Sequence, residues 1–389
     1  MISVPFFDLT RQYATMEKEI LDAILPLLRS QQFILGPAVS EFEGQFAHAF
    51  GLSRAVGVSS GTDALVLSLV ASGLRPGQGV LVPSFTFFAS ASAISLAGGT
   101  PVFLDVDPAS FLMTPEILDR FLREETRPGP GERPVTRRGN HLISGVMAVH
   151  LYGQMVDMEE LYRVARSHGL WIVEDACQSV GARHSDRPPG LFSNAAAYSF
   201  FPTKNLGGAG DGGMVTTENP DFADHLLRLR VHGSRKRYEH EEMGYNARLD
   251  ALQARILSVK LSRLGDWTTR RRELAGRYNE AFRDLPGTAL PVPQPECLHV
   301  YHQYTLRIDG EGRRDSLRTF LSERGIGSEV YYPIPLHRQE AFAGLVPGTS
   351  PLPVSERLCR EVISLPVFPE LTDNEQERVI DAVRAFLGR

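Results

Sequence analysis

In Ser199-Phe200-Phe201-Pro202-Thr203-Lys204-Asn205-Leu206-Gly207-Gly208, one lysine stands between an apolar, aromatic run and a glycine-rich turn. The preceding residues 195–201 have the pattern of a short buried strand. The glycines that follow allow the backbone to turn tightly and to approach a bound group. Lysine is costly to bury, and its amine becomes nucleophilic when desolvation lowers its pKa. Alone, the segment is equally typical of a surface lysine on a glycine loop; with the rest of the chain it favours a lysine that forms a Schiff base.

Strands alternate with helices along the first part of the chain. Buried strands are expected at 55–58, 79–89, 100–107, 143–150 and 170–175, and helices at 14–30 and 158–168. This alternation predicts an α/β fold with a doubly wound, mostly parallel sheet. We expect residues 1–249, including the N-terminal arm, to form a large α/β domain. Residues 250–389 are expected to form a smaller α+β domain, which one long helix ending near residue 283 introduces.

Several polar or aromatic residues fall at the expected carboxyl ends of strands, where ligands bind in such folds. They are Ser60, Gly61, Phe87, His150, Asp175 and Ser199. Ser60 is a plausible N-cap of the next helix, with Asp63 three residues later in an arrangement like a capping box. The first turn of that helix would offer free N–H groups to a phosphate. A merely well-capped helix would show the same pattern.

Asp175 ends an expected buried strand, where a carboxylate needs a cationic or hydrogen-bonding partner. A protonated pyridine nitrogen is one suitable partner. A phosphate site, an aromatic ring for stacking, this carboxylate and Lys204 together match the recurring protein environment of pyridoxal phosphate. The sequence therefore predicts a pyridoxal 5′-phosphate enzyme, although each part alone is a weak signal.

Composition and charge restrict the classes of binding partner and the cellular compartment that we expect for this protein. The formal net charge of −5 gives no general attraction to nucleic acid or anionic membranes, and no apolar segment approaches the length of a membrane span. No signal peptide is visible at the N-terminus. The three cysteines, Cys177, Cys297 and Cys359, are far apart without metal-ligand spacing. We expect a cytoplasmic protein without a metal site, a nucleic-acid partner or a membrane partner.

The motifs and their order resemble the DegT/DnrJ/EryC1/StrS family of sugar aminotransferases, within the fold-type I pyridoxal-phosphate enzymes. The resemblance covers nearly the whole chain. It rests on Ile34-Leu35-Gly36-Pro37, Ser60-Gly61-Thr62-Asp63-Ala64-Leu65, Pro83-Ser84-Phe85-Thr86-Phe87, Glu174-Asp175-Ala176-Cys177-Gln178, the lysine segment, residues 244–254, and Ser364-Leu365-Pro366-Val367-Phe368-Pro369.

This resemblance implies a role for each matching residue. Lys204 would form the Schiff base with the cofactor and move the proton, and Asp175 would pair with the ring nitrogen. The other cofactor contacts would come from Gly61, Thr62 and Ser199 at the phosphate beside the Ser60 cap, Phe87 on the ring face, Gln178 near the ring hydroxyl, and Asn246 of a neighbouring subunit. The site is therefore expected to be shared across a homodimer.

The implied reaction moves an amino group, with glutamate as donor, to a keto group of a UDP- or dTDP-linked sugar in amino-sugar biosynthesis. Related dehydratases replace the lysine with histidine, so Lys204 favours transamination over deoxygenation. The segment Arg248-Leu249-Asp250-Ala251-Leu252-Gln253 resembles family members that act at C3 of 3-keto sugars slightly more than it resembles C4 enzymes. The alternatives are a cofactor-binding regulatory or sensory protein without turnover, and an aminotransferase of another cyclic ketone, such as an inosose.

The remaining signals have competing interpretations. Residues 208–213 satisfy G-x-G-x-x-G but lead into an expected strand, which excludes a dinucleotide site. The basic run with Arg235 and Arg237 is either a solvated turn or a contact for a nucleotide diphosphate. Tyr332 and His337 lie either near the substrate, as the resemblance implies, or in a proline-rich loop beside the site. Residues 123–141 are expected to be a surface loop.

Overall fold

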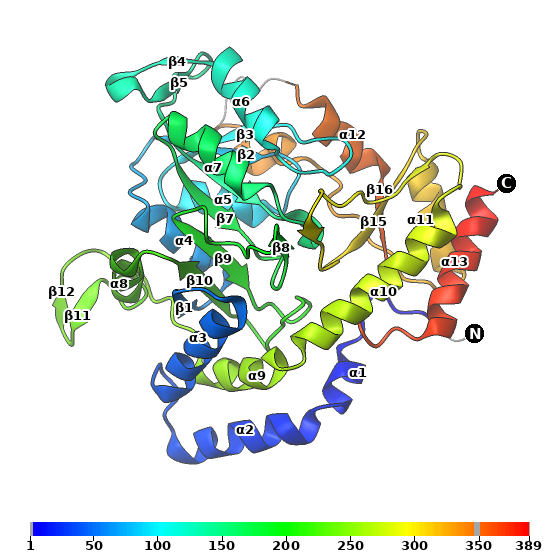
Figure 1. Ribbon diagram of the computed structural model, residues 1–389, viewed down its shortest axis with the longest axis horizontal. Coiled ribbons are helices and arrows are strands. Elements are labelled where there is room, and N and C mark those ends of the chain that lie inside the picture. The colour runs from blue at the N-terminus through cyan, green and yellow to red at the C-terminus, as the bar shows by residue number, and fades with distance from the viewer. Residues whose placement is uncertain (1–2, 346–350, 389) are drawn as a thin grey trace.

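The computed structural model describes residues 3–345 and 351–388, and a seven-stranded sheet forms its centre (Figure 1). In spatial order the strands are β1 (Arg54–Val58), β10 (Gly213–Thr217), β9 (Ala195–Ser199), β7 (Trp171–Asp175), β6 (Ile143–Val149), β2 (Gly79–Pro83) and β3 (Thr100–Leu104). The strands from β9 to β3 pair in parallel, and β10 runs antiparallel to both of its neighbours. The predicted α/β fold with a mostly parallel sheet is confirmed.

Strand β10 owes its direction to the glycine turn after Lys204. The chain leaves β9 at Ser199 and returns through residues 207–213 directly into β10, so that Gly213 pairs with Ser199. No crossover helix intervenes between these two strands. The G-x-G-x-x-G run therefore opens a strand, as expected, and the carboxyl ends of β1 and β9 meet the start of β10 at one edge of the sheet.

Helices cover both faces of the sheet, because successive strand residues point to opposite faces. On one face, strand residues such as Val56, Val82 and Ala197 pack in one apolar cluster with α4 (Gly61–Ala71), α5 (Phe88–Leu96) and α8 (Pro220–Leu229). On the other face, strand residues pack with α3 (Pro37–Phe50), α6 (Pro115–Glu124), α7 (Met158–Ser167) and α9 (Ala251–Leu261). Helix α4 is buried nearly all round, since α5 and α8 cover it from outside.

A smaller unit follows around a second sheet, with strand order β13 (Thr288–Ala289), β15 (Tyr304–Ile308) and β16 (Val362–Leu365). Its apolar cluster includes residues of α10 (Leu264–Phe282), α11 (Arg313–Glu323) and α13 (Asp373–Leu387), and Val4 from the start of the chain joins it. Helix α12 (Pro353–Glu361) begins beside Asp105, whose carboxylate accepts hydrogen bonds from the backbone N–H groups of Val354 and Ser355.

The long helix expected up to residue 283 is in fact two helices. Helix α9 buries Ala254 and Leu257 in the core of the large unit, whereas α10 buries Leu274 and Tyr278 in the core of the small one. The break at 262–263 lies where the chain passes from one core to the other. Helix α9 follows residue 250 but packs in the core of the large unit. The domain boundary at 249/250 therefore stays a prediction.

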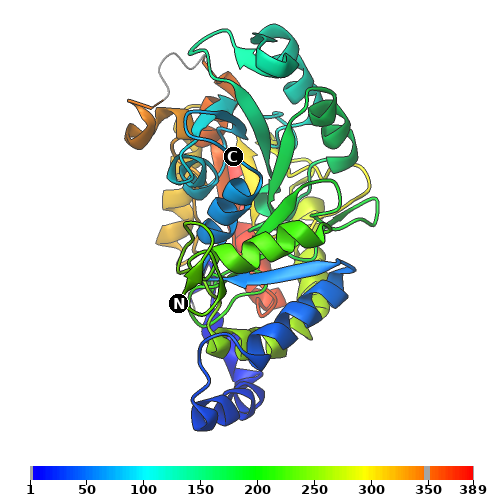
Figure 2. The same cartoon turned by 90° about the vertical axis from the view of Figure 1, so that its left-hand side faces the viewer.

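Peripheral elements complete the described chain. Helices α1 (Leu9–Ala14) and α2 (Glu17–Ser30) precede the sheet, and both views show α2 at one end of the molecule (Figures 1 and 2). The loop expected at 123–141 contains an antiparallel pair, β4 (Thr126–Pro128) and β5 (Pro134–Thr136), because a turn beginning at Gly129 brings its two sides together. Two further short pairs are β8 (Arg183–His184) with β14 (Cys297–Leu298), and β11 (Ser234–Lys236) with β12 (Glu239–His240). No described helix has the length and apolar character needed to cross a membrane.

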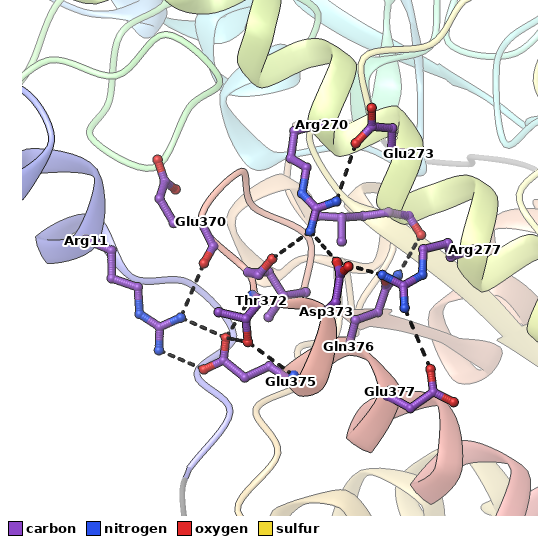
Figure 3. A network of polar contacts seen from close by, with 12 residues as sticks. Arg11, Arg270, Glu273, Arg277, Glu370, Thr372, Asp373, Glu375, Gln376 and Glu377 are labelled. Atoms are coloured by element: carbon purple, nitrogen blue, oxygen red, sulfur yellow. Dashed lines mark hydrogen bonds and ion pairs between the residues drawn. The ribbon is translucent and has the colours of Figure 1, made fainter.

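The start of α13 is tied to α1 and α10 by charged side chains (Figure 3). Thr372 and Glu375 form a capping box, and Arg11 donates hydrogen bonds to both carboxylate oxygens of Glu375, at 2.7 and 2.8 Å. Arg270 and Arg277 of α10 each lie 2.7 Å from Asp373. The hydrogen bonds from Arg11 lower the pKa of Glu375 to about 2. The N-terminal arm is thus fastened to the small unit.

Glu375→Gln should lower the free energy of unfolding at pH 7 by roughly 1–3 kcal/mol, because the carboxylate that Arg11 binds is lost. Because the pKa of Glu375 in the folded protein is lower than its ordinary value of 4.5, the ionised carboxylate stabilises the fold fully above pH 4.5. This stabilisation is lost as the pH falls toward 2. The difference from the wild type should therefore shrink between pH 5 and pH 3 in urea unfolding curves. Glu377→Gln is the control, because that side chain is 55% exposed and 3.7 Å from Arg277. An equal loss at pH 7 and pH 3 would contradict the assignment.

Candidate active site

A cavity of about 440 Å³ opens at the carboxyl edge of the central sheet. It is lined by most of the predicted site residues, namely Ser60, Gly61, Thr62, Phe87, Asp175, Gln178, Ser199, Lys204 and Tyr332. They come from the ends of β1, β7 and β9, the start of α5, and the loop after α11. A second cavity, of about 400 Å³ between β3 and α6, contains none of these residues. Of the residues expected at strand ends, all except His150 line the first cavity, and Thr62, Gln178 and Tyr332, which the family resemblance implied, lie there too.

One end of this cavity suits an anion. Ser60 caps α4 by accepting a hydrogen bond from the N–H of Asp63 at 3.0 Å, and the first N–H groups of the helix have no partner within it. Contrary to the expected capping box, the Asp63 carboxylate accepts from the hydroxyls of Ser59 and Ser60, at 2.5 and 3.0 Å. A β-carbon on Gly61 would lie 2.6 Å from that of Ser199, so only glycine lets Ser199 approach this helix end. The arrangement can hold a phosphate.

The carboxylate of Asp175 lies at another wall of the cavity and is 6% exposed. Its Oδ2 accepts a hydrogen bond from Ser90 Oγ at 2.6 Å, and its Oδ1 accepts from the backbone N–H of Cys177 at 3.1 Å. No ion pair within residues 3–345 and 351–388 involves this carboxylate. A buried carboxylate without an ion pair among these residues fits the cationic ring nitrogen of pyridoxal phosphate.

Lys204 is half-buried in the cavity wall, one turn beyond β9. Desolvation lowers the pKa of its amine, while Cys177 and Asp175 act in the opposite direction. A β-carbon on Gly207 would lie 2.1 Å from the carbonyl oxygen of Pro202, so the turn after the lysine requires glycine there. An amine with a lowered pKa is suited to bond with an aldehyde and to exchange protons.

Aromatic and amide groups complete the described wall. Phe87 is 53% exposed, and its ring centroid lies 6.0 Å from that of Tyr332. Gln178 accepts a hydrogen bond from the N–H of Tyr152 at 2.7 Å and donates one to the hydroxyl of Tyr332 at 2.9 Å. Its amide is thereby fixed in one orientation. The structure places Tyr332, Phe87 and Gln178 where a flat ring inside the cavity could meet all three.

Other predicted residues do not line this cavity. Asn246 is exposed, and so are Arg235 and Arg237 on the β11–β12 hairpin, which projects from the opposite side of the molecule to α13 (Figure 1). Arg235 lies 3.2 Å from Glu241, and Arg237 lies over the ring of Tyr238. Within one chain, none of these three residues lines the cavity.

Two histidines are buried away from the cavity. His337 Nδ1 lies 2.6 Å from Ser84 Oγ, and its Nε2 lies 3.1 Å from Glu356. Burial lowers the pKa of His337, and these contacts fasten the loop that carries Tyr332 to the end of β2. His150, just after the end of β6, is fully buried and 2.7 Å from Glu174, and it does not line the cavity.

Sequence reasoning missed several residues at the site. Thr86, Cys177, Asp211, His302, Gln303 and Tyr331 also line the cavity. Cys177 and Thr86 are next to predicted site residues in the chain, which is a usable signal. His302 is nearly a hundred residues from Lys204, and its ring is placed by Asn205, 3.2 Å away. Only the fold brings that part of the chain to the cavity.

Comparisons with known proteins agree with this geometry. Residues 14–384 match the model of the DegT/DnrJ/EryC1/StrS aminotransferase family. A dTDP-3-amino-3,4,6-trideoxy-alpha-D-glucose transaminase from Streptomyces venezuelae is 42% identical over 386 residues, 99% of this chain and 97% of that protein. A pleiotropic regulatory protein from Geobacillus stearothermophilus is 40% identical over 387 residues, 99% of each chain. The crystal structure of S. venezuelae DesV with a ketimine intermediate has a TM-score of 0.92 at 41% identity, with 100% of both chains covered.

Gly61→Ala should push Ser199 away from α4, since the new methyl group would also lie 3.0 Å from the sulfur of Cys177. We expect a loss of roughly 1–3 kcal/mol in stability and about tenfold weaker binding of pyridoxal phosphate. Binding of pyridoxal, which lacks the phosphate, should change much less. Gly44→Ala in α3 is the control, because nothing lies within 4 Å of its added carbon. Unchanged affinity for both ligands in Gly61→Ala would contradict a phosphate site here.

Proposed function

This chain belongs to the DegT/DnrJ/EryC1/StrS aminotransferase family, and we propose that it transfers an amino group from glutamate to the C3 ketone of a nucleotide-linked sugar. It is a pyridoxal-phosphate-dependent enzyme that aminates nucleotide-linked keto sugars. The choice of C3, the donor and the arrangement of subunits are the finer parts of the proposal.

The observation that carries the proposal is that Lys204 and Asp175 share one cavity, with a helix N-terminus at its end. When bound, the cofactor supplies an aldehyde that bonds amines and a cationic ring that accepts electron density. Asp175 would hold the proton on the ring nitrogen. Gly61, Thr62 and Ser199 would bind the phosphate, Phe87 would cover one face of the ring, and Gln178 would lie beside its hydroxyl.

Lys204 would then act on the proton of the substrate. Its lowered pKa leaves more of the amine unprotonated near neutral pH, as a general base requires. After taking the proton from the amine-bearing carbon, the same side chain can return it as an acid. The half-buried position limits access of water to this amine. A lysine here, rather than a histidine, supports amino transfer over removal of oxygen.

A second copy of the chain would complete the site. Phe87 and Phe201 line the cavity but are 53% and 50% exposed, which leaves large rings uncovered at its mouth. On α2, Leu21, Leu25 and Leu28 are also about two-fifths exposed. In the proposed homodimer, Asn246 of one subunit reaches the phosphate in the other, and Arg235 and Arg237 are candidates for the nucleotide diphosphate.

Two observations bear on the remaining finer points. The S. venezuelae relative is named for a 3-amino sugar. This agrees with the slight resemblance of residues 248–253 to family members that act at C3. Glutamate as donor is proposed from the family resemblance alone. All three cysteines are free, which supports a cytoplasmic enzyme. Tyr332 remains a candidate for sugar binding, and His337 for holding its loop.

One relative favours a second candidate function, since its name is that of a pleiotropic regulatory protein. A regulatory protein could bind the cofactor without turnover. The two functions differ in the response to glutamate alone, which converts the cofactor of a transaminase to its pyridoxamine form and leaves that of a binding protein unchanged.

The substrate proposal is tested with glutamate and a panel of UDP- and dTDP-linked 3-keto and 4-keto sugars, with the mass of the product as readout. We expect the pyridoxamine form with glutamate and an amino sugar from a 3-keto member of the panel. Lys204→Ala should remain folded, lack the Schiff-base absorbance and give no product, a loss of at least about a thousandfold. Product from Lys204→Ala would contradict the assignment of this lysine. Product only from 4-keto sugars would contradict C3.

The shared site is tested by mixing two inactive variants, Lys204→Ala and Asn246→Ala, in equal amounts after mild dissociation. In a mixed dimer, one site has both Lys204 from one subunit and Asn246 from the other. About a quarter of wild-type activity should return, since half of the dimers are mixed and each has one complete site. Each variant incubated alone is the control. No recovery despite formation of mixed dimers would show that Asn246 acts within its own subunit or not at all.

A further inference from the structure

Ser90 lies in α5, three residues after Phe87, and is fully buried. Its Oγ donates a hydrogen bond to Asp175 Oδ2 at 2.6 Å, across a separation of 85 residues. Ser90 is not among the residues that line the cavity. Any effect of its hydroxyl on a ligand must therefore pass through one of its two hydrogen-bond partners that line the cavity, Asp175 or Thr86.

The neighbouring Thr86 fixes the direction of this hydrogen bond. Its Oγ1 lies 3.1 Å from Ser90 Oγ, and the two hydroxyls are both buried. Because Ser90 has one hydroxyl hydrogen and gives it to the carboxylate, Thr86 must donate to Ser90. The Thr86 hydroxyl thus donates to Ser90, and the Ser90 hydroxyl donates to Asp175. In such a chain each hydrogen bond polarises and strengthens the next.

The carboxylate of Asp175 is held at both oxygens. Cys177 donates its backbone N–H to Oδ1, and the Ser90 hydroxyl donates to Oδ2. Without the hydrogen bond at Oδ2, the carboxylate could rotate about its bond to the β-carbon. Loss of the hydroxyl would therefore free the orientation of the carboxylate and leave its charge less well solvated.

We propose that Ser90 is a positioning residue, which fixes the Asp175 carboxylate toward the ring nitrogen of the cofactor. This inference rests on the proposed function, in which that nitrogen is the cation Asp175 binds. The same hydrogen bond joins the first turn of α5 to β7. It therefore also fixes the carboxylate relative to Phe87, the ring proposed to cover the cofactor.

The test is a double-mutant cycle on the dissociation constant of pyridoxal phosphate, measured by titration of apoprotein followed at the Schiff-base absorbance. The proteins are the wild type, Ser90→Ala, Asp175→Asn and the double variant. Ser95→Ala is the matched control, because its hydroxyl is buried in the same helix and has no partner. Ser90→Cys, which keeps nearly the same volume with a weaker donor, is measured as well in case Ser90→Ala does not fold.

Ser90→Ala should bind the cofactor about tenfold more weakly than the wild type, as expected for loss of a hydrogen bond to a charged group. In the Asp175→Asn background the same change should matter less than about twofold, since the group through which Ser90 acts is gone. Ser95→Ala should bind like the wild type, and Ser90→Cys should fall in between. In Ser90→Ala, the Schiff-base absorbance should also titrate at a different pH.

Three results would overturn the positioning role: wild-type affinity in Ser90→Ala, an equal loss in the Asp175→Asn background, or an equal loss in Ser95→Ala. Failure of the proposed function gives a different result. If the wild type binds pyridoxal phosphate but aminates no sugar, the cycle still decides the role of Ser90. If the wild type does not form the Schiff-base absorbance at all, both proposals fall together.

Discussion

The structure depends on one buried carboxylate that forms no ion pair with any residue that the structure describes. Asp175 accepts hydrogen bonds from Ser90 and from the N–H of Cys177, yet both donors are neutral. A buried charge that is solvated only by neutral donors is costly for the fold. A cationic ring bound in the adjoining cavity would offset this unfavourable free energy of burying the carboxylate. Cofactor binding should then stabilise the folded chain, and the apoprotein should be less stable than the holoenzyme.

The sheet explains how the other groups reach this carboxylate. Parallel strands bring the ends of β1, β7 and β9 to one edge, and the antiparallel β10 closes that edge with glycines. A β-carbon on Gly213 would lie 2.3 Å from the carbonyl oxygen of Ser60, so strand and helix end meet only because no side chain separates them. The phosphate site and the lysine turn are therefore two parts of one close packing arrangement.

Much of this site could be predicted from the sequence, because strand ends are recognisable and the topology brings them together. Asp175 and Ser199 are predicted in this way, and Lys204 is predicted by its place between an apolar run and a glycine-rich turn. Ser90 was not, since a serine in an alanine-rich helix resembles its neighbours and its partner is 85 residues away. The break between α9 and α10 was also missed, because helical periodicity continues while the core against which it packs changes. In the proposed homodimer, the positions of Asn246, Arg235 and Arg237 relative to a ligand would depend on a second chain, which no pattern within one chain can supply.

The central claim is that Asp175 keeps the ring nitrogen of the cofactor protonated. Nitrogen NMR of the protein reconstituted with pyridoxal phosphate labelled with ¹⁵N in the ring measures this directly. We expect a protonated ring nitrogen at neutral pH in the wild type, and an unprotonated one in Asp175→Asn. An unprotonated nitrogen in the wild type at neutral pH would contradict this role of Asp175.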